Sequence, residues 1–394
     1  MPTLEQTAED LVAAARDLAP LIREYADEAE RERQLSEPVV AALHRAGIFR
    51  MWVPRELGGP EADPVTFMRV LEELARADGS VAWVVANCAS FSSYTALLPE
   101  EGAHEVWDDL AALVARSGSR RGLCKALAVE GGYRVTGRWA FVSGIDHAGW
   151  VVTGGAVYDG DAPRLDAGGR PVQISAVAPR DSITIHDTWY VSGLCGTGSN
   201  EYSIDDVFVP ERRILSLASR VPRCSGAFYR IPSSTAFPAE FAPMLLGMAR
   251  TAIDALVELA TDKVPTYGPG RALRELPGVQ RSVARAEGLL ESARAYYYQE
   301  IQALWERAQH GDPLDLAGRG RVRLAATHAC LAAAEAVDLV YTAGASDSIF
   351  RHSRLQRCFR DIHAASQTIM ANEEIGLLPA GRVLLGLEPG TPMF

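Results

Sequence analysis

The sequence lacks the features that mark several common classes of protein. Acidic residues outnumber basic ones by 50 to 39 among 394 residues, the net charge is −11, and no basic run occurs, so we expect no binding to nucleic acid or to an anionic membrane surface. The six cysteines form no CxxC pair and no zinc-site spacing, so we expect no metal site. No run of about 18 apolar residues predicts a membrane span. The acidic start MPTLEQTAEDLVAAARDL is unlike a secretion signal, which favours a cytoplasmic protein with reduced thiols.

The first hundred or so residues have the period of amphipathic helices. One apolar face repeats at three- and four-residue steps and consists of Leu4, Ala8, Leu11, Ala15 and Leu18. A later helix is expected to begin at Asp63-Pro64, because aspartate is a favoured N-cap and proline fits the first helical position, and to end at Gly79. The apolar stretch 80–98 predicts another helix directly after it.

From about residue 112 the period changes to two. In GYRVTGRWAFVS, residues 132–143, one face carries Trp139, Phe141 and Ser143. Shorter strand-like runs follow at 150–157, 172–177, 182–186 and 201–209. Because no helix-length segment separates them, these strands predict a mainly antiparallel sheet without βαβ units.

The helical period returns in the last part of the chain, in runs over 244–261, 280–309 and 321–342. The order helical, β, helical predicts an α+β fold. We expect three domains, namely an N-terminal helical domain over 1–111, a central antiparallel β-domain over 112–218 and a C-terminal helical bundle over 219–394.

Several stretches in this order resemble one family. They are GIFRMWVPRELGGP at 47–60, GGYRVTGRWAFVSGIDHAGW at 131–150, SGLCGTGSNEYSIDDVFVP at 192–210, RLQRCFRDIHAASQ at 354–367 and GRVLLGLEPGTP at 381–392. The chain resembles the acyl-CoA dehydrogenase fold and, more closely, the flavin-dependent monooxygenases built on it. The resemblance implies a flavin between the β-domain and the C-terminal bundle, in a homo-oligomer that is usually a tetramer.

The resemblance also implies which residues contact the flavin. In the family an aromatic-x-Ser/Thr segment at the end of one strand rests against the isoalloxazine ring, and here the matching residues are Trp139, Phe141, Ser143 and Gly144. An aromatic side chain can stack beside the ring, and a hydroxyl can bond to its N5 or O4 edge. For the two aromatic residues, a role as filling of the sheet's core stays open.

The base that a dehydrogenase needs is missing from its usual place. That place lies nine residues after the arginine of the Arg360-Asp361 pair and falls on Ile369, or on Met370 with a slip of one residue, and neither can accept a proton. Some relatives carry the acid at the start of the bundle's first helix. Glu240 stands in that region without matching the family's spacing, and we interpret it as a solvated acid at a helix start.

Loss of the base favours the monooxygenase branch. The resemblance then implies that a separate reductase supplies reduced FMN or FAD, which takes up O2 as a C4a-hydroperoxide and oxygenates a small aromatic or heteroatom-bearing substrate. No GxGxxG fingerprint is present, so we do not expect the chain to reduce its own flavin. Two alternatives stay open: an acyl-CoA dehydrogenase or oxidase with Glu240 as base, and a non-catalytic scaffold with this fold.

Two histidines common in the hydroxylases of this group are replaced by polar residues without a base. One position holds Thr368, and the other corresponds to Cys88 and Ser92. Threonine cannot deprotonate a phenol, so an amine, an indole or an anionic enol is the favoured substrate. If the last helix is continuous, Asn372 shares a face with Thr368.

The resulting site prediction has three parts, with no metal. The predicted catalytic residues are Ser143, Thr368 and Asn372. The predicted substrate pocket is lined by Cys88, Ser92, Ile369 and Met370. Four arginines at three-residue steps either reach the flavin phosphate across a subunit interface or form salt bridges within the bundle, namely Arg351, Arg354, Arg357 and Arg360.

Overall fold

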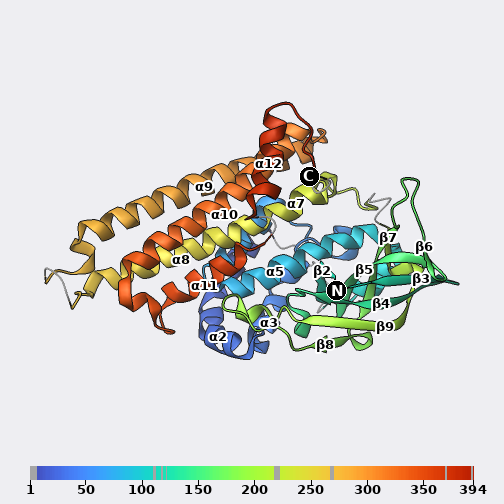
Figure 1. Ribbon diagram of the computed structural model, residues 1–394, viewed down its shortest axis with the longest axis horizontal. Helices are drawn as coiled ribbons and strands as arrows, with labels where there is room; N and C mark the ends of the chain where they lie inside the picture. Colours follow the sequence, from blue (N-terminus) through green and yellow to red (C-terminus); the bar gives the residue numbers. More distant parts are fainter. Residues whose placement is uncertain are drawn as a thin grey trace.

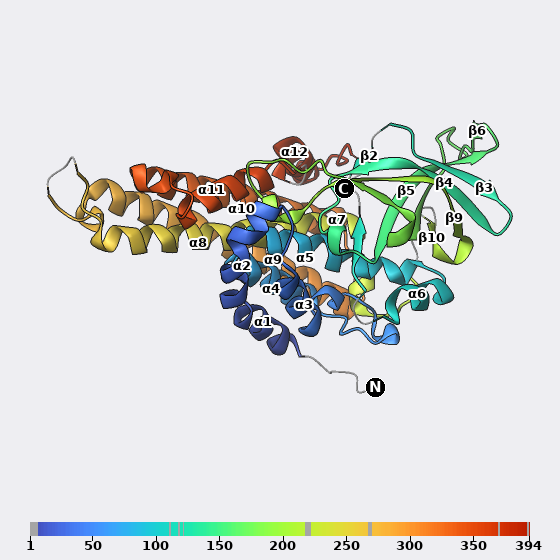
Figure 2. The same cartoon turned by 90° about the horizontal axis from the view of Figure 1, so that it is seen from below.

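A computed structural model describes residues 7–109, 112–116, 119–120, 122–216, 222–266, 270–368, 371–391 and 394. A twisted sheet lies at one end of the molecule and a bundle of long helices at the other, with helices of the N-terminal part between and below them (Figures 1 and 2). Helix α5 contacts both strand β1 and the bundle helix α8, so it joins the two halves.

The N-terminal part is helical, as predicted. Its helices are α1 (Ala8–Asp17), α2 (Ala19–Glu32), α3 (Glu37–Arg45), α4 (Pro64–Ala75), α5 (Gly79–Ser92) and α6 (Glu100–Trp107). Asp63 caps α4 as expected, accepting a hydrogen bond from the Thr66 amide. The predicted end at Gly79 is wrong, because Asp78 accepts two amide hydrogen bonds and makes Gly79 the first residue of α5.

The sheet contains ten strands among the described residues. They are β1 (Val114–Arg116), β2 (Ser119–Arg120), β3 (Lys125–Val129), β4 (Gly132–Ala140), β5 (Trp150–Asp159), β6 (Ala162–Pro163), β7 (Gln173–Pro179), β8 (Thr184–His186), β9 (Glu201–Pro210) and β10 (Ile214–Ser216). The main path runs β10-β7-β5-β3-β4-β9-β8.

The sheet is mixed but mainly antiparallel, in agreement with the prediction. Most pairings are antiparallel, but β5 pairs in parallel with β1 and β3. The reason is the chain path: β4 runs back beside β3, and β5 reverses again to pair with the other edge of β3. The short connections without helices in residues 112–218 predicted that successive strands reverse direction, but they did not predict which strands pair with each other.

The C-terminal part consists of α7 (Ser233–Ala239), α8 (Phe241–Asp262), α9 (Pro277–His310), α10 (Leu316–Ala343), α11 (Arg354–Ala365) and α12 (Glu373–Leu384). By length and composition alone, α10 is apolar enough to cross a membrane. It is a core helix, because α8, α9, α11 and α12 pack around it (Figure 1) and most of its alanines are buried. Small side chains allow this close packing on several sides.

Candidate active site

The chain turns sharply after β4, and this turn places the predicted flavin-binding segment. Phe141 has a φ of 58° and Gly144 a φ of 73°, both in the left-handed region. The turn breaks the strand alternation, so the Phe141 side chain is 54% exposed whereas Ser143 is only 4% exposed. Phe141 meets Trp189 edge to face, with 6.1 Å between the ring centroids. The segment therefore offers an exposed aromatic surface beside a buried hydroxyl.

Ser143 belongs to a chain of hydrogen-bonded hydroxyl groups whose direction can be derived. Each hydroxyl has one hydrogen, and Thr197 donates its hydrogen to the Leu194 carbonyl at 2.9 Å. Thr197 must therefore accept from Ser199 at 2.7 Å, and Ser199 from Ser143 at 2.8 Å. Trp83 Nε1 donates to Ser143 Oγ at 3.1 Å. The Ser143 hydrogen is thus used, and one lone pair of its oxygen stays available.

Gly144 lets helix α5 pack tightly under this segment. A Cβ at Gly144 would lie 2.9 Å from Val84 Cγ1 and 3.1 Å from Cys88 Sγ. Cys88 is buried, and burial raises the pKa of its thiol, so it is a neutral group that packs beneath the segment. Ser92 is also buried, and its hydroxyl donates to the Ala89 carbonyl of its own helix at 2.6 Å. Of the two, only Cys88 touches the predicted flavin segment.

Trp139 lies in the core of the sheet. It is 1% exposed, its ring stacks on Tyr202 at 5.2 Å, and its Nε1 donates to the Gly154 carbonyl at 3.0 Å. The prediction put Trp139 on one face with Phe141 by counting in steps of two, and the left-handed turn at Phe141 ends that alternation. These contacts with Tyr202 and the Gly154 carbonyl favour the alternative in which Trp139 fills the core of the sheet.

The predicted pairing of Thr368 with Asn372 is wrong. Helix α11 ends at Ala365 and α12 begins at Glu373, so the two residues share no helical face. Asn372 is exposed and caps α12 by accepting from the Glu374 amide at 2.8 Å. Thr368 lies in the turn after α11, where its amide donates to a backbone carbonyl. Ile369 and Met370 lie outside the described residues.

The Arg360-Asp361 pair holds the loop that carries the hydroxyl chain. Asp361 accepts from the Leu194 amide at 2.7 Å, and Arg360 donates to the Ser192 carbonyl at 2.6 Å. Burial and the neighbouring Asp78 raise the pKa of Asp361 to about 7. These two residues fix the backbone of the loop that carries Thr197 and Ser199.

Three of the four arginines on or near α11 form ion pairs within the chain. Arg354 pairs with Glu258, whereas Arg357 and Arg360 both contact Glu30. Among the described residues, the Arg351 side chain has no such partner, so it is the member of the set that stays available for a phosphate.

Glu240 corrects another expectation, because it is fully buried. It joins α7 to α8, and among the described residues neither carboxyl oxygen has a hydrogen-bond partner. Burial raises its pKa well above 4.5, and the nearby Ser90 and Arg116 only partly oppose that rise. The sequence held a signal for this burial, since Glu240 is the only charged residue between Arg230 and Arg250.

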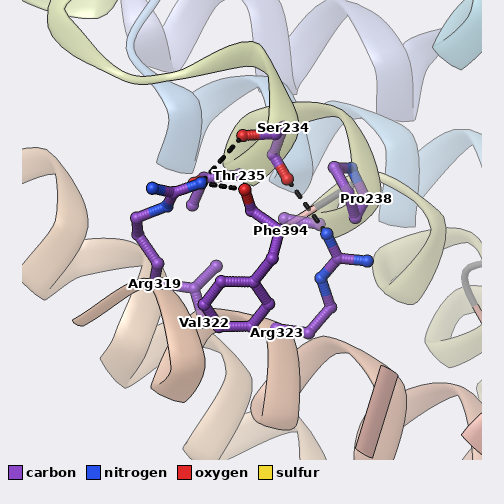
Figure 3. Close-up of a pocket in the computed structure, with 8 residues that line it drawn as sticks. Ser234, Thr235, Pro238, Arg319, Val322, Arg323 and Phe394 are labelled. Atoms are coloured by element: carbon purple, nitrogen blue, oxygen red, sulfur yellow. Dashed lines mark hydrogen bonds between the residues drawn. The ribbon is translucent and has the colours of Figure 1, made fainter. Parts of the chain in front are cut away.

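A small cavity beside α7 is not the active site. Its free volume is about 10 Å³, which is about the room for one water molecule. Arg319 donates to the Phe394 carbonyl and Arg323 to the Ser234 carbonyl, and the Phe394 ring lies between the two arginines (Figure 3). The cavity is lined by Ser234, Thr235, Pro238, Ala239, Arg319, Val322, Arg323 and Phe394.

The chain matches two family models. The acyl-CoA dehydrogenase N-terminal domain matches residues 5–105, and the acyl-CoA dehydrogenase C-terminal domain matches residues 239–373. Among curated proteins, indole-3-acetate monooxygenase of Pseudomonas putida is 32% identical and covers 97% of this chain and 94% of its own length. The flavin-dependent monooxygenase oxygenase subunit HsaA of Rhodococcus jostii is 32% identical and covers 88% and 91%.

A solved structure extends the likeness to three dimensions. XiaF from Streptomyces, in complex with FADH2 and glycerol, superposes with a TM-score of 0.89 at 26% sequence identity, covering 98% of this chain and 97% of that one. The similarity therefore spans both helical parts and the sheet, and it favours a monooxygenase over the dehydrogenase and scaffold alternatives.

Proposed function

This chain belongs to the flavin-dependent monooxygenases built on the acyl-CoA dehydrogenase fold, and we propose that within this family it oxygenates a small aromatic substrate that reacts without a catalytic base. It is the oxygenase component of a two-component system that hydroxylates aromatic substrates and receives reduced flavin from a separate reductase. We further propose that the flavin is FAD rather than FMN. The FADH2 bound to the similar XiaF supports FAD.

The residues present fit a reduced flavin. The exposed Phe141 ring offers a surface for a planar ring system. Ser143 has donated its hydrogen to Ser199 and keeps a lone pair, so it suits an N–H donor such as the N5 position of a reduced isoalloxazine. Trp83 fixes the Ser143 oxygen by donating to it. When bound, reduced flavin supplies the electrons that activate O2.

The chemistry of the described groups supports a substrate that needs no base. Ser143 Oγ contacts the Ser199 hydroxyl and the Trp83 indole N–H. Ser199 contacts the Thr197 hydroxyl, and the buried Cys88 thiol donates to the Ser143 carbonyl. None of these groups takes a proton from a phenol at neutral pH. An electron-rich ring such as an indole, or an aromatic amine, meets these conditions.

We also propose a cytoplasmic homotetramer. Helix α12 and the residues after it expose four leucines, namely Leu378, Leu384, Leu385 and Leu387. Exposed apolar side chains gathered on one element are typical of a subunit interface. All six cysteines are free thiols, which suits a reducing compartment. Light scattering of the purified protein tests the assembly.

The observation that carries the proposal is the buried hydroxyl with a free lone pair beside an exposed aromatic ring. The test mixes the protein with reduced FMN or FAD under argon and then adds oxygenated buffer. We expect bound flavin to return to its oxidised spectrum far more slowly than free flavin, and faster when an electron-rich aromatic is added and a hydroxylated product forms. Reoxidation at the rate of free flavin with both cofactors contradicts the proposal, and bleaching of oxidised flavin by an acyl-CoA indicates a dehydrogenase instead.

A further inference from the structure

Glu240 is an unusual acid because its carboxyl oxygens make no hydrogen bond of normal geometry within the described residues, although Ser90 and Arg116 lie near enough to influence the carboxyl. Its carboxyl group is 0% exposed and has no hydrogen-bond partner among the described residues. The buried Glu72 shows what a structural acid looks like in this chain, since Arg294 and Tyr298 each lie 2.6 Å from its oxygens. A buried unpartnered carboxyl destabilises the folded chain. Features that carry such a cost are typical of functional sites.

Phe241, which follows Glu240 in the chain, belongs to a continuous group of rings, which we name the aromatic box. It consists of Trp83, Phe91, Tyr94, Phe237 and Phe241. Consecutive rings lie within 5.2 to 5.9 Å of each other: Trp83 with Phe241, Phe241 with Phe237, Phe237 with Phe91, and Phe91 with Tyr94. Helices α5, α7 and α8 contribute four of these rings, and Tyr94 stands in the short 3-10 helix Ser93–Leu97 after α5. Helices α5 and α8 pack directly together.

The aromatic box leads from the flavin segment to Glu240. At one end Trp83 donates to Ser143, which we place at the flavin. At the other end the Arg116 guanidinium lies 4.5 Å from the Phe91 ring centre. Glu240 directly precedes Phe241, and Ser90 and Arg116 are the groups that act on its carboxyl. The acid and the hydroxyl chain thus flank the same set of rings.

We propose that the Glu240 carboxyl anchors an aromatic substrate by accepting a hydrogen bond from its N–H or O–H group, while the aromatic box holds its ring. The inference rests on the proposed function and adds the residue that recognises a hydrogen-bond donor on the edge of the substrate's ring. Because burial keeps the carboxyl neutral, it presents a carbonyl acceptor without an uncompensated charge. Glu240 is a binding residue here and takes no proton from the substrate.

The test compares indole with 1-methylindole, which have similar rings but differ in the N–H group. Equilibrium dialysis under argon measures the dissociation constant of each probe with the protein and reduced flavin. We expect indole to bind the native protein about tenfold more tightly, because only indole supplies a hydrogen bond to the buried acceptor. Glu240→Leu should reduce the ratio of the two dissociation constants (1-methylindole over indole) to about one. Glu240→Gln should keep most of this ratio, because its amide carbonyl can accept the same hydrogen bond.

Thermal unfolding separates this role from a structural one. Glu240→Leu should raise Tm by a few degrees, since it removes an unpartnered buried carboxyl. The matched control Glu72→Gln should lower Tm, because it weakens contacts to Arg294 and Tyr298, and should leave the indole ratio unchanged.

Three results would overturn the anchor: equal or absent binding of the two probes by the native protein, an undiminished ratio in Glu240→Leu, or a loss of ratio that Glu72→Gln reproduces. Failure of the proposed function is a separate outcome. It shows as fast flavin reoxidation in the native protein, whatever the indole ratio is.

Discussion

Ser143→Ala tests the hydroxyl chain most directly. The change removes the acceptor of the Trp83 indole N–H and the donor to Ser199, at 3.1 and 2.8 Å. A buried donor left without a partner costs about 1–3 kcal/mol, so we expect about 2 kcal/mol of lost stability. With an unfolding entropy of about 2.1 cal/mol/K per residue over 394 residues, this corresponds to a fall in Tm of about 2–3 °C.

The functional effect should be larger than the effect on Tm. Ser143 offers the lone pair that suits a reduced flavin's N–H, and one such hydrogen bond contributes about 1.4 kcal/mol, or a factor of about ten. We expect flavin bound to Ser143→Ala to reoxidise about tenfold faster in oxygenated buffer, measured by stopped-flow absorbance. Ser182→Ala is the control, because its hydroxyl only donates to the Pro179 carbonyl in the same sheet region.

A double-mutant cycle with Trp83→Phe checks the hydrogen bond between Trp83 and Ser143. Phenylalanine keeps a ring in the aromatic box but removes the indole N–H that Ser143→Ala leaves unpaired. The double variant should therefore be no less stable than Ser143→Ala alone, with a coupling of about 1 kcal/mol or more. Additive losses of stability, or a reoxidation rate unchanged in Ser143→Ala, would refute the reasoning.

Two further predictions concern the supports of this segment. Burial and Asp78 raise the pKa of Asp361 from 3.8 to about 7, so between these pH values the folded chain holds a proton that the unfolded chain releases. The stability should therefore fall as pH rises from about 4 to about 7. Asp361→Asn should flatten the slope of Tm against pH, and an unchanged slope contradicts this. Gly144→Ala and Gly131→Ala both place alanine at a φ of 73–74°, which costs about 1–2 kcal/mol of stability. Only the new Cβ at residue 144 lies closer than 3.4 Å to other side chains, which costs about 1–3 kcal/mol more. We expect Gly144→Ala to have the lower Tm and to bind reduced flavin more weakly. Equal Tm values for the two alanine variants would show that α5 can move away from residue 144 without loss of stability.

Much of the fold could be predicted from local pattern. The strand runs at 150–157 and 201–209 became β5 and β9, and the helical runs at 244–261 and 280–309 became α8 and α9, each to within a few residues. The helix start at Asp63 was also right, because capping depends on residues three positions apart. Helix α2 was missed, since its apolar face carries mainly small alanines.

The site was predicted only in part. Ser143 and Phe141 occupy the strand end where the resemblance put them, although their contact with a flavin stays a prediction. Trp83 and Ser199 were missed as partners of Ser143, although Trp83 lies in the predicted helix 80–98 and Ser199 in the family-like stretch 192–210. Trp139 was matched to the flavin segment by the resemblance, with a role as core filling left open, and its burial against Tyr202 favours the core role.

The sequence by itself determined the order of helices and strands, the absence of a base at 369–370 and the family. Only the tertiary structure decided which polar groups are buried together. Ser143 meets a donor 60 residues away and Leu194 an acceptor 167 residues away, whereas periodicity reports on neighbours three or four residues apart. Glu240 became a buried acid for the same reason, because burial is set by the helices that pack over a residue and not by its position along its own helix.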